Sequence, residues 1–198
     1  MRIIGITGGV GSGKSEVLRY LNERWGAEIL ALDEVSRRLL DRDGAGYQKT
    51  VELFGRGILK EDGSVDRPAV AKLVFADTEL REALNGIIHP LVKEETLVRI
   101  ADARKRGVRL FVIEAALLIE GNYDAICDEM WYIHADAEVR AERLRRTRGY
   151  DDSRIRGVMA GQLSEEEFRA HCGQVIENSG DFSETKRQID RLIQKIGV

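Results

Sequence analysis

The sequence is poor in cysteine, in aromatic residues and in long apolar runs. Among 198 residues there are two cysteines, and aromatic residues make up 6%. Cys127 and Cys172 stand alone, without the paired spacing of a metal site or the density of a disulfide scaffold, so both are expected to be buried thiols. No apolar stretch approaches the length of about 20 residues that a membrane helix needs. Internal repeats and low-complexity segments are also lacking.

An excess of positive charge is missing as well. The net charge of -3 argues against a general nucleic-acid binder, because affinity for a phosphate backbone requires a basic field. The amino terminus shows no basic segment followed by an apolar one, so we expect no secretory signal, no membrane partner and a cytoplasmic location. The balance of 43% hydrophobic and 33% charged residues is typical of a globular chain, and we expect a single domain.

The most specific motif of the chain follows its first apolar run. Residues 3–7 are too few for anything but a strand, and the apolar residues after the motif have helical spacing. Such a strand, loop and helix place successive backbone N–H groups and the positive end of a helix dipole on the phosphates of a nucleotide. The residues predicted to bind the nucleotide here are Gly8, Gly9, Val10, Gly11, Ser12, Gly13, Lys14, Ser15 and Glu16.

Two side chains of this motif carry specific chemistry. Lys14 supplies a positive charge to the phosphates, and the Ser15 hydroxyl is the predicted ligand of Mg²⁺. We therefore expect a nucleoside triphosphate and Mg²⁺ as ligands. The alternative is a glycine-rich turn with an incidental lysine.

Five apolar runs alternate with helical patterns. This alternation predicts a parallel α/β sheet covered on both faces, with ligands bound beyond the carboxyl ends of the strands. The runs are residues 3–7, 28–32, 110–113, 130–133 and 174–176. The polar residues that directly follow strands are Asp33, Glu114, His134, Asp136 and Asn178.

The second and third runs are separated by a long insertion, residues 35–106. Its segments 67–75 and 79–88 show helical patterns, and Pro68 suits a first helical turn. An excursion of this length is typical of a substrate-binding subdomain. We accordingly expect a core of residues 1–34, 107–138 and 172–198, with this insertion and a lid of residues 139–171.

The predicted lid is rich in arginine. Its basic residues are Arg140, Arg143, Arg145, Arg146 and Arg148. In a phosphoryl-transfer enzyme, a mobile arginine-bearing lid supplies positive charge to the transition state and excludes water. A solvated helix face is the alternative interpretation.

The remaining sequence separates classes of nucleotide-binding protein. No asparagine is followed by lysine, so the guanine-reading motif of GTPases is absent. The third run is followed by Glu114, whereas motor ATPases usually carry aspartate there. A small-molecule kinase fits best, and a regulatory or motor NTPase is the alternative.

The chain resembles the dephospho-CoA kinase family. The matching segments are residues 6–15, Gly26-Ala27 with Asp33, Asp62-Gly63-Ser64 with Asp66-Arg67, Ile88-His89-Pro90, Leu117-Leu118 before Glu120, and residues 176–180. The resemblance implies a P-loop NTPase fold of the nucleoside-monophosphate-kinase type, with a five-stranded parallel sheet, a helical insertion and a lid. It also implies phosphorylation of the ribose 3′-hydroxyl of dephospho-CoA by ATP, giving CoA and ADP. Another small hydroxyl acceptor or a nucleotide remains the alternative substrate.

The resemblance implies catalytic and binding roles for particular residues. Asp33 matches the second aspartate of a D-A-D motif whose first position is Ala31 here, which leaves Asp33 as the candidate base and acceptor ligand. Arg67 and His89 match the acceptor-binding insertion. Glu114 stands where many members have aspartate, and it too is assigned to the acceptor.

The lid and the last strand also have counterparts in the family. The lid arginine could be Arg143, Arg146 or Arg148, and Arg143 and Arg148 are the candidates for catalysis. Asn178 matches a loop near the adenine.

Each of these residues has a structural alternative. Asp33 could only cap a helix, and His89 before Pro90 could end one. Glu114 could pair with Arg109, and Asn178 could form a turn and nothing more.

Overall fold

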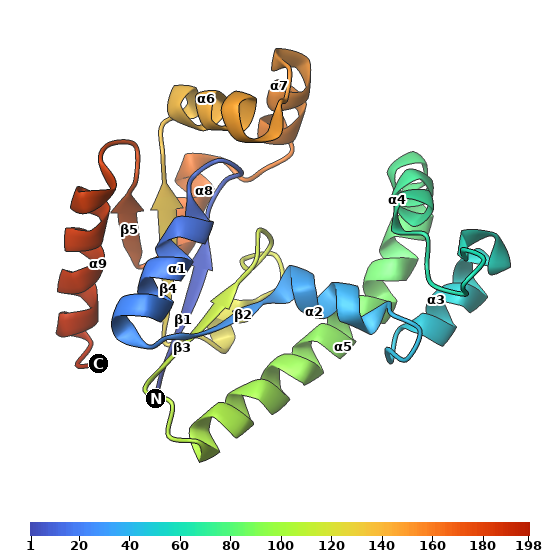
Figure 1. The fold of residues 1–198 in the computed structure, drawn as a ribbon, viewed down its shortest axis with the longest axis horizontal. Coiled ribbons are helices and arrows are strands. Elements are labelled where there is room, and N and C mark those ends of the chain that lie inside the picture. The colour runs from blue at the N-terminus through green and yellow to red at the C-terminus, as the bar shows by residue number, and fades with distance from the viewer. The chain divides into compact units, whose positions relative to one another are not determined.

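Five parallel strands form the central sheet of this protein (Figure 1). The computed structural model describes all residues from Met1 to Val198. The strands are β1 (Arg2–Thr7), β2 (Glu28–Ala31), β3 (Leu110–Glu114), β4 (Glu129–His134) and β5 (Gln174–Glu177), in the spatial order β2-β3-β1-β4-β5. Strand β1 pairs in parallel with β3 and with β4, and β4 pairs with β5. The predicted α/β class and all five strands are confirmed, although Leu32 starts a helix and does not end β2.

The chain divides into two units. The first comprises Met1–Leu30 and Ala103–Val198, and the second comprises Ala31–Asp102. Besides the strands, the first unit contains α1 (Lys14–Trp25), the 3-10 turn η2 (Tyr123–Ala125), α6 (Ala137–Arg148), α7 (Asp152–Ala160), α8 (Glu165–His171) and α9 (Phe182–Lys195). The second contains α2 (Leu32–Leu39), α3 (Tyr47–Phe54), η1 (Arg56–Ile58) and α4 (Arg67–Ala76), and α5 spans Thr78–Lys105.

One face of the sheet packs on α1 and α9. Ile4 and Ile6 alternate along β1 and point to the same side, where they join Val17 of α1 and Ile189 of α9 in one core cluster. Because each of these side chains is almost fully buried, the cluster holds the start of α1 firmly against the end of β1.

The other face is covered in part by α8. The ring of Phe168 stacks on that of Tyr132 in β4, with centroids 4.6 Å apart and planes within 9°. Cys172, directly after α8, is buried, and burial raises the pKa of its thiol to about 11. Cys127 is partly buried, and desolvation raises its pKa to about 12, so both thiols stay protonated at neutral pH.

The second unit has a small core of its own. Ile58, Val65 and Val70 pack together. Helix α4 begins as predicted, with Pro68 in its first turn and Asp66 as the N-cap whose side chain accepts a hydrogen bond from Ala69 N.

Helix α5 contradicts the interpretation of His89 as the end of a helix. The segment His89-Pro90 lies inside this 28-residue helix, so His89 does not end a helix. Val92, Thr96 and Ile100 continue a buried stripe at intervals of four residues beyond the proline. Packing of this stripe outweighs the one hydrogen bond that Pro90 cannot donate. None of the helices combines the length and apolar character that crossing a membrane requires.

Candidate nucleotide-binding site

The loop between β1 and α1 has the geometry of a phosphate cradle. Gly8, Gly11 and Gly13 have φ values of 151°, 82° and 91°. Gly13 is the N-cap of α1, and a Cβ atom there would lie 2.2 Å from Nδ2 of Asn178. Glycine is therefore required at this position by both backbone conformation and space. The loop delivers the N-terminus of a twelve-residue helix to the carboxyl edge of the sheet, where an anion is stabilised.

Lys14, Ser12 and Ser15 give the loop its polar side chains. Lys14 Nζ donates to the carbonyl oxygen of Gly8 at 2.6 Å, which holds the ammonium group over the loop. The Ser12 hydroxyl is buried and has no hydrogen-bond partner, and such a group favours a ligand oxygen beside it. Ser15 is exposed in the first turn of α1. A serine hydroxyl is a hard oxygen donor that suits Mg²⁺, an ion commonly held by few protein oxygens together with phosphates and water.

Asn178 fastens the loop to the end of β5. It is buried, and its Nδ2 donates to the carbonyl oxygen of Ser12 at 2.7 Å. Its Oδ1 accepts from Thr185 Oγ1 at 2.8 Å, and its backbone N–H donates to the carbonyl oxygen of His134 at 2.8 Å. The interpretation of Asn178 as a turn residue and nothing more is therefore wrong.

Two arginines of α6 also reach the loop. Arg143 donates to the carbonyl oxygens of Ser12 at 3.3 Å and Asn178 at 2.8 Å. Arg140 Nε donates to the carbonyl oxygen of Val10 at 2.9 Å. These contacts place two positive charges beside the predicted phosphate site, and Figure 1 shows α6 at the end of β4 that adjoins the loop.

The other arginines of this run lie away from the loop. Arg145 pairs with Asp152 at 2.9 Å. Arg146 is exposed, and the Arg148 guanidinium lies 6.0 Å from the Tyr150 ring centroid. These three residues therefore make no contact with the loop in this structure, whereas the solvated-face interpretation fails for Arg140 and Arg143.

A charged cluster stands beside Asn178 at the ends of β4 and β5. His134 Nδ1 lies 2.5 Å from Glu177 Oε2, and its Nε2 lies 3.4 Å from Glu165 Oε2. Burial favours the neutral carboxyl of Glu177, but hydrogen bonds from Ser179 and His134 outweigh it and lower the pKa of Glu177.

The remaining predicted residues lie in the second unit or at the edge of β3. Asp33 is exposed and is the second residue of α2. The N-cap of α2 is Ala31, so the interpretation of Asp33 as a helix cap is wrong. Arg67 pairs with Asp41 at 2.6 Å, and His89 is exposed. Glu114 is the last residue of β3.

Two contributors to this site, Arg140 and Gln162, are not singled out by any sequence motif. Arg140 was included only as a member of the arginine run. Gln162, between α7 and α8, accepts a hydrogen bond from Val10 N at 3.2 Å. No local pattern marks Gln162, because its role depends on a contact across 152 positions of the chain.

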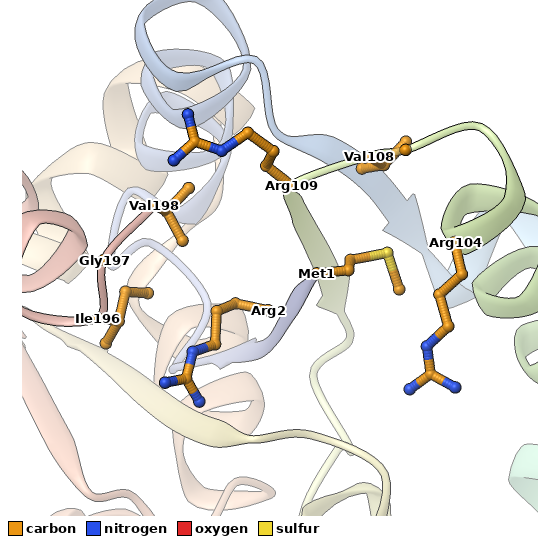
Figure 2. Close-up of a pocket in the computed structure, with 9 residues that line it drawn as sticks. Met1, Arg2, Arg104, Val108, Arg109, Ile196, Gly197 and Val198 are labelled. Carbon is orange, nitrogen blue, oxygen red and sulfur yellow. The ribbon is translucent and has the colours of Figure 1, made fainter.

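A cavity of about 480 Å³ lies at the opposite edge of the sheet (Figure 2). Three arginines line it: Arg2, which begins β1, Arg109, which precedes β3, and Arg104. The three guanidinium groups lie apart in Figure 2 and do not converge on one point. This cavity is separate from the phosphate loop, which follows the carboxyl end of β1.

Comparisons with known proteins find relatives that match nearly the whole chain. A dephospho-CoA kinase of Geobacter sulfurreducens is 37% identical over 195 residues, covering 98% of each chain. One of Carboxydothermus hydrogenoformans is 35% identical over 193 residues, covering 98% of this chain and 93% of the relative. The crystal structure of TT1252 from Thermus thermophilus superposes with a TM-score of 0.85 at 29% identity, covering 100% of this chain and 98% of the other.

More distant structures share the fold. A shikimate kinase from Acinetobacter baumannii has a TM-score of 0.58 at 16% identity, covering 100% of this chain and 96% of the other, which confirms the predicted kinase-type architecture of sheet and helices. The family model of dephospho-CoA kinase matches residues 2–184. With this match, and with full-length relatives above 30% identity, the chain belongs to the dephospho-CoA kinase family.

Proposed function

We propose that this protein transfers the γ-phosphoryl group of ATP to the ribose 3′-hydroxyl of dephospho-CoA, giving CoA and ADP. The observation that carries the proposal is the family match over residues 2–184, which includes the whole phosphate loop. The relatives that support it are dephospho-CoA kinases matched along nearly their full length. The reactants are small molecules, and we place the enzyme in the cytoplasm with them.

ATP binds with its β- and γ-phosphates on the loop between β1 and α1. Backbone N–H groups of the glycine-rich loop and the N-terminus of α1 donate to the phosphate oxygens, and Lys14 neutralises part of their charge. The hydroxyl of Ser15 would hold Mg²⁺, which would supply positive charge to the phosphates. Asn178 holds the Ser12 carbonyl and thereby keeps the loop in place. We assign Asn178 to the loop near the adenine.

Asp33 is the proposed general base. Its carboxylate orients the 3′-hydroxyl and accepts its proton as the oxygen attacks the γ-phosphorus in line. Ala31 cannot share this role, since it carries no acid. The exposure of Asp33 in the first turn of α2 leaves its carboxylate accessible to an acceptor.

The insertion of residues 35–106 binds the acceptor in this proposal. Arg67 and His89 within it, and Glu114 at the end of β3, contact dephospho-CoA. The ion pair between Arg67 and Asp41 keeps the guanidinium group in a defined place.

The lid of residues 139–171 completes the site. Arg143 already contacts the loop, and Arg148 is exposed beside Tyr150, from where it reaches the ligand when the lid moves. Together they neutralise charge on the transferred phosphoryl group and exclude water.

A parallel assay of acceptors tests this function. ATP consumption and ADP formation are measured with dephospho-CoA, adenosine, shikimate and nucleoside monophosphates, each offered alone. Turnover with dephospho-CoA far above that with the other acceptors is the expected result. Strong ATP hydrolysis without any acceptor, or preference for another acceptor, would refute it.

A further inference from the structure

A closed ring of hydrogen bonds joins the tip of the phosphate loop to two separate segments of the predicted lid. Gln162 Oε1 accepts from the backbone N–H of Val10 at 3.2 Å and from Arg140 Nη2 at 2.5 Å. Arg140 Nε in turn donates to the carbonyl oxygen of Val10 at 2.9 Å. Both backbone polar groups of Val10 are thus bonded by side chains from residues more than 120 positions away. We name these three residues the Val10 brace.

The brace is tightly packed. A Cβ atom at Gly9 would lie 2.3 Å from Arg140 Nη2, so the guanidinium group sits directly against the loop backbone. Arg140 and Gln162 are both partly buried, and burial lowers the pKa of Arg140 without depriving it of its charge. A partly desolvated hydrogen bond of this kind is worth more than one in open water.

The neutral character of Gln162 matters as much as its position. Both acceptors of the Arg140 guanidinium, the amide of Gln162 and the carbonyl of Val10, are uncharged. An amide oxygen orients the guanidinium group without cancelling its positive charge, whereas a carboxylate would form an ion pair with it. The positive charge is thereby retained beside a loop that is built to bind anions.

We propose that Gln162 is a positioning residue that orders the tip of the phosphate loop before nucleotide arrives. It acts through Val10 and Arg140 and does not touch the reacting atoms. A loop that already has its bound shape loses less conformational freedom when ATP binds, so the brace strengthens ATP binding. Because this order is needed equally by the ground state and the transition state, its loss affects KM for ATP and leaves kcat nearly unchanged.

Three variants test the brace. Gln162→Leu removes the acceptor at similar size, and Gln162→Glu keeps an acceptor oxygen for Val10. Gln194→Leu, on the exposed side of α9, is the matched control. For each, the hydrogen exchange of the Val10 amide is followed by NMR in the unliganded full-length protein. Binding of ATP with Mg²⁺ is measured by calorimetry, and steady-state kinetics are recorded with dephospho-CoA.

In Gln162→Leu we expect the Val10 amide to exchange about tenfold faster, as for the loss of a hydrogen bond of ordinary strength. The Kd and KM for ATP should rise by about the same factor, with kcat within about threefold of wild type. Gln162→Glu should restore protection of the Val10 amide, and Gln194→Leu should match wild type throughout. If Gln162→Leu does not fold, Gln162→Ala carries the same expectations.

The outcomes separate this inference from the proposed function on which its kinetic part rests. Exchange of the Val10 amide in Gln162→Leu within twofold of wild type would overturn the brace, whatever the enzyme phosphorylates. Faster exchange with unchanged ATP affinity would overturn its role in ordering the loop. Failure of the wild-type protein to phosphorylate dephospho-CoA, with exchange and ATP binding shifted as expected, would refute the function and leave the brace standing.

Discussion

The side-chain amide of Asn178 donates to the carbonyl oxygen of Ser12 at 2.7 Å, although 166 positions separate the two residues. This bond ties the end of β5 to the phosphate loop that follows β1. Because β4 lies between β1 and β5 in the sheet, the contact spans the carboxyl edge beyond that strand. The loop is thus held from two sides, by Asn178 near α1 and by the Val10 brace at its tip.

Asn178→Ala should destabilise the protein by about 1–3 kcal/mol, because it removes the hydrogen bonds that the buried side-chain amide makes with the Thr185 hydroxyl and the Ser12 carbonyl. Urea unfolding followed by circular dichroism gives the free energy of unfolding. Asn85→Ala, at an exposed position of α5, is the control and should change little. Equal stability of the two variants would contradict the structural role of Asn178.

Lys14→Ala should abolish phosphoryl transfer and leave the fold intact, since Lys14 is the first residue of α1, outside the apolar core, and its charge acts on phosphates. Turnover and circular dichroism are measured on the same preparation, with the exposed Lys195→Ala as control. Activity above about a tenth of wild type would remove Lys14 from its proposed role, since such charges contribute orders of magnitude in rate.

Asp33→Asn should lower kcat by roughly two to four orders of magnitude with ATP affinity nearly unchanged, the usual effect of losing a positioned general base. The neighbouring Glu34→Gln alters an exposed acid on the same turn and should keep most activity. Since Asp33 does not cap α2, its substitution should leave stability close to wild type. Near-normal turnover of Asp33→Asn would move the search for a base to Glu114.

Substitutions of the lid arginines should have different kinetic effects. Arg143→Ala should weaken ATP binding, because Arg143 holds the Ser12 and Asn178 carbonyls beside the loop. Arg148→Ala should lower kcat more than it raises KM, the signature of a contact made mainly in the transition state. Arg146→Ala is the exposed control from the same helix. Equal and small kinetic effects for all three would favour a solvated helix face.

Acid should weaken the contact between His134 and Glu177. Hydrogen bonds from Ser179 and His134 lower the pKa of Glu177 against the effect of burial. A carboxyl group whose pKa is lower in the folded state stabilises that state at pH values above the pKa of the group in the unfolded chain, which is about 4.3. This stabilisation is lost as the pH falls through the pKa of the group in the folded state. Wild type should therefore be more stable than Glu177→Gln at pH 7, and the difference should shrink below about pH 4.

Thermal unfolding at both pH values measures this difference. Glu166→Gln, at an exposed position of α8, is the control and should follow wild type at each pH. A difference between wild type and Glu177→Gln that is independent of pH would contradict the assignment to ionised Glu177.

Local patterns were sufficient to predict the strands, the phosphate loop and the start of α4. An apolar run before the glycines of residues 8–15 predicts strand and loop together, and Pro68 after Asp66 predicts a helix start, because each signal depends on residues close in the chain. The resemblance of scattered motifs to the dephospho-CoA kinase family was sufficient to predict the family that the comparisons confirm. These features require no knowledge of which distant segments meet.

Tertiary structure alone decided the contacts that shape the site. Helix α5 continues through Pro90 because its buried stripe outweighs a missing hydrogen bond, and Ala31 takes the N-cap position in place of Asp33. Arg143 meets the loop while Arg146, three residues on, is exposed, which only the packing of α6 on the loop determines. Gln162 bonds Val10 across 152 residues, and a hydrogen bond at that separation leaves no periodicity or spacing for a sequence pattern to reveal.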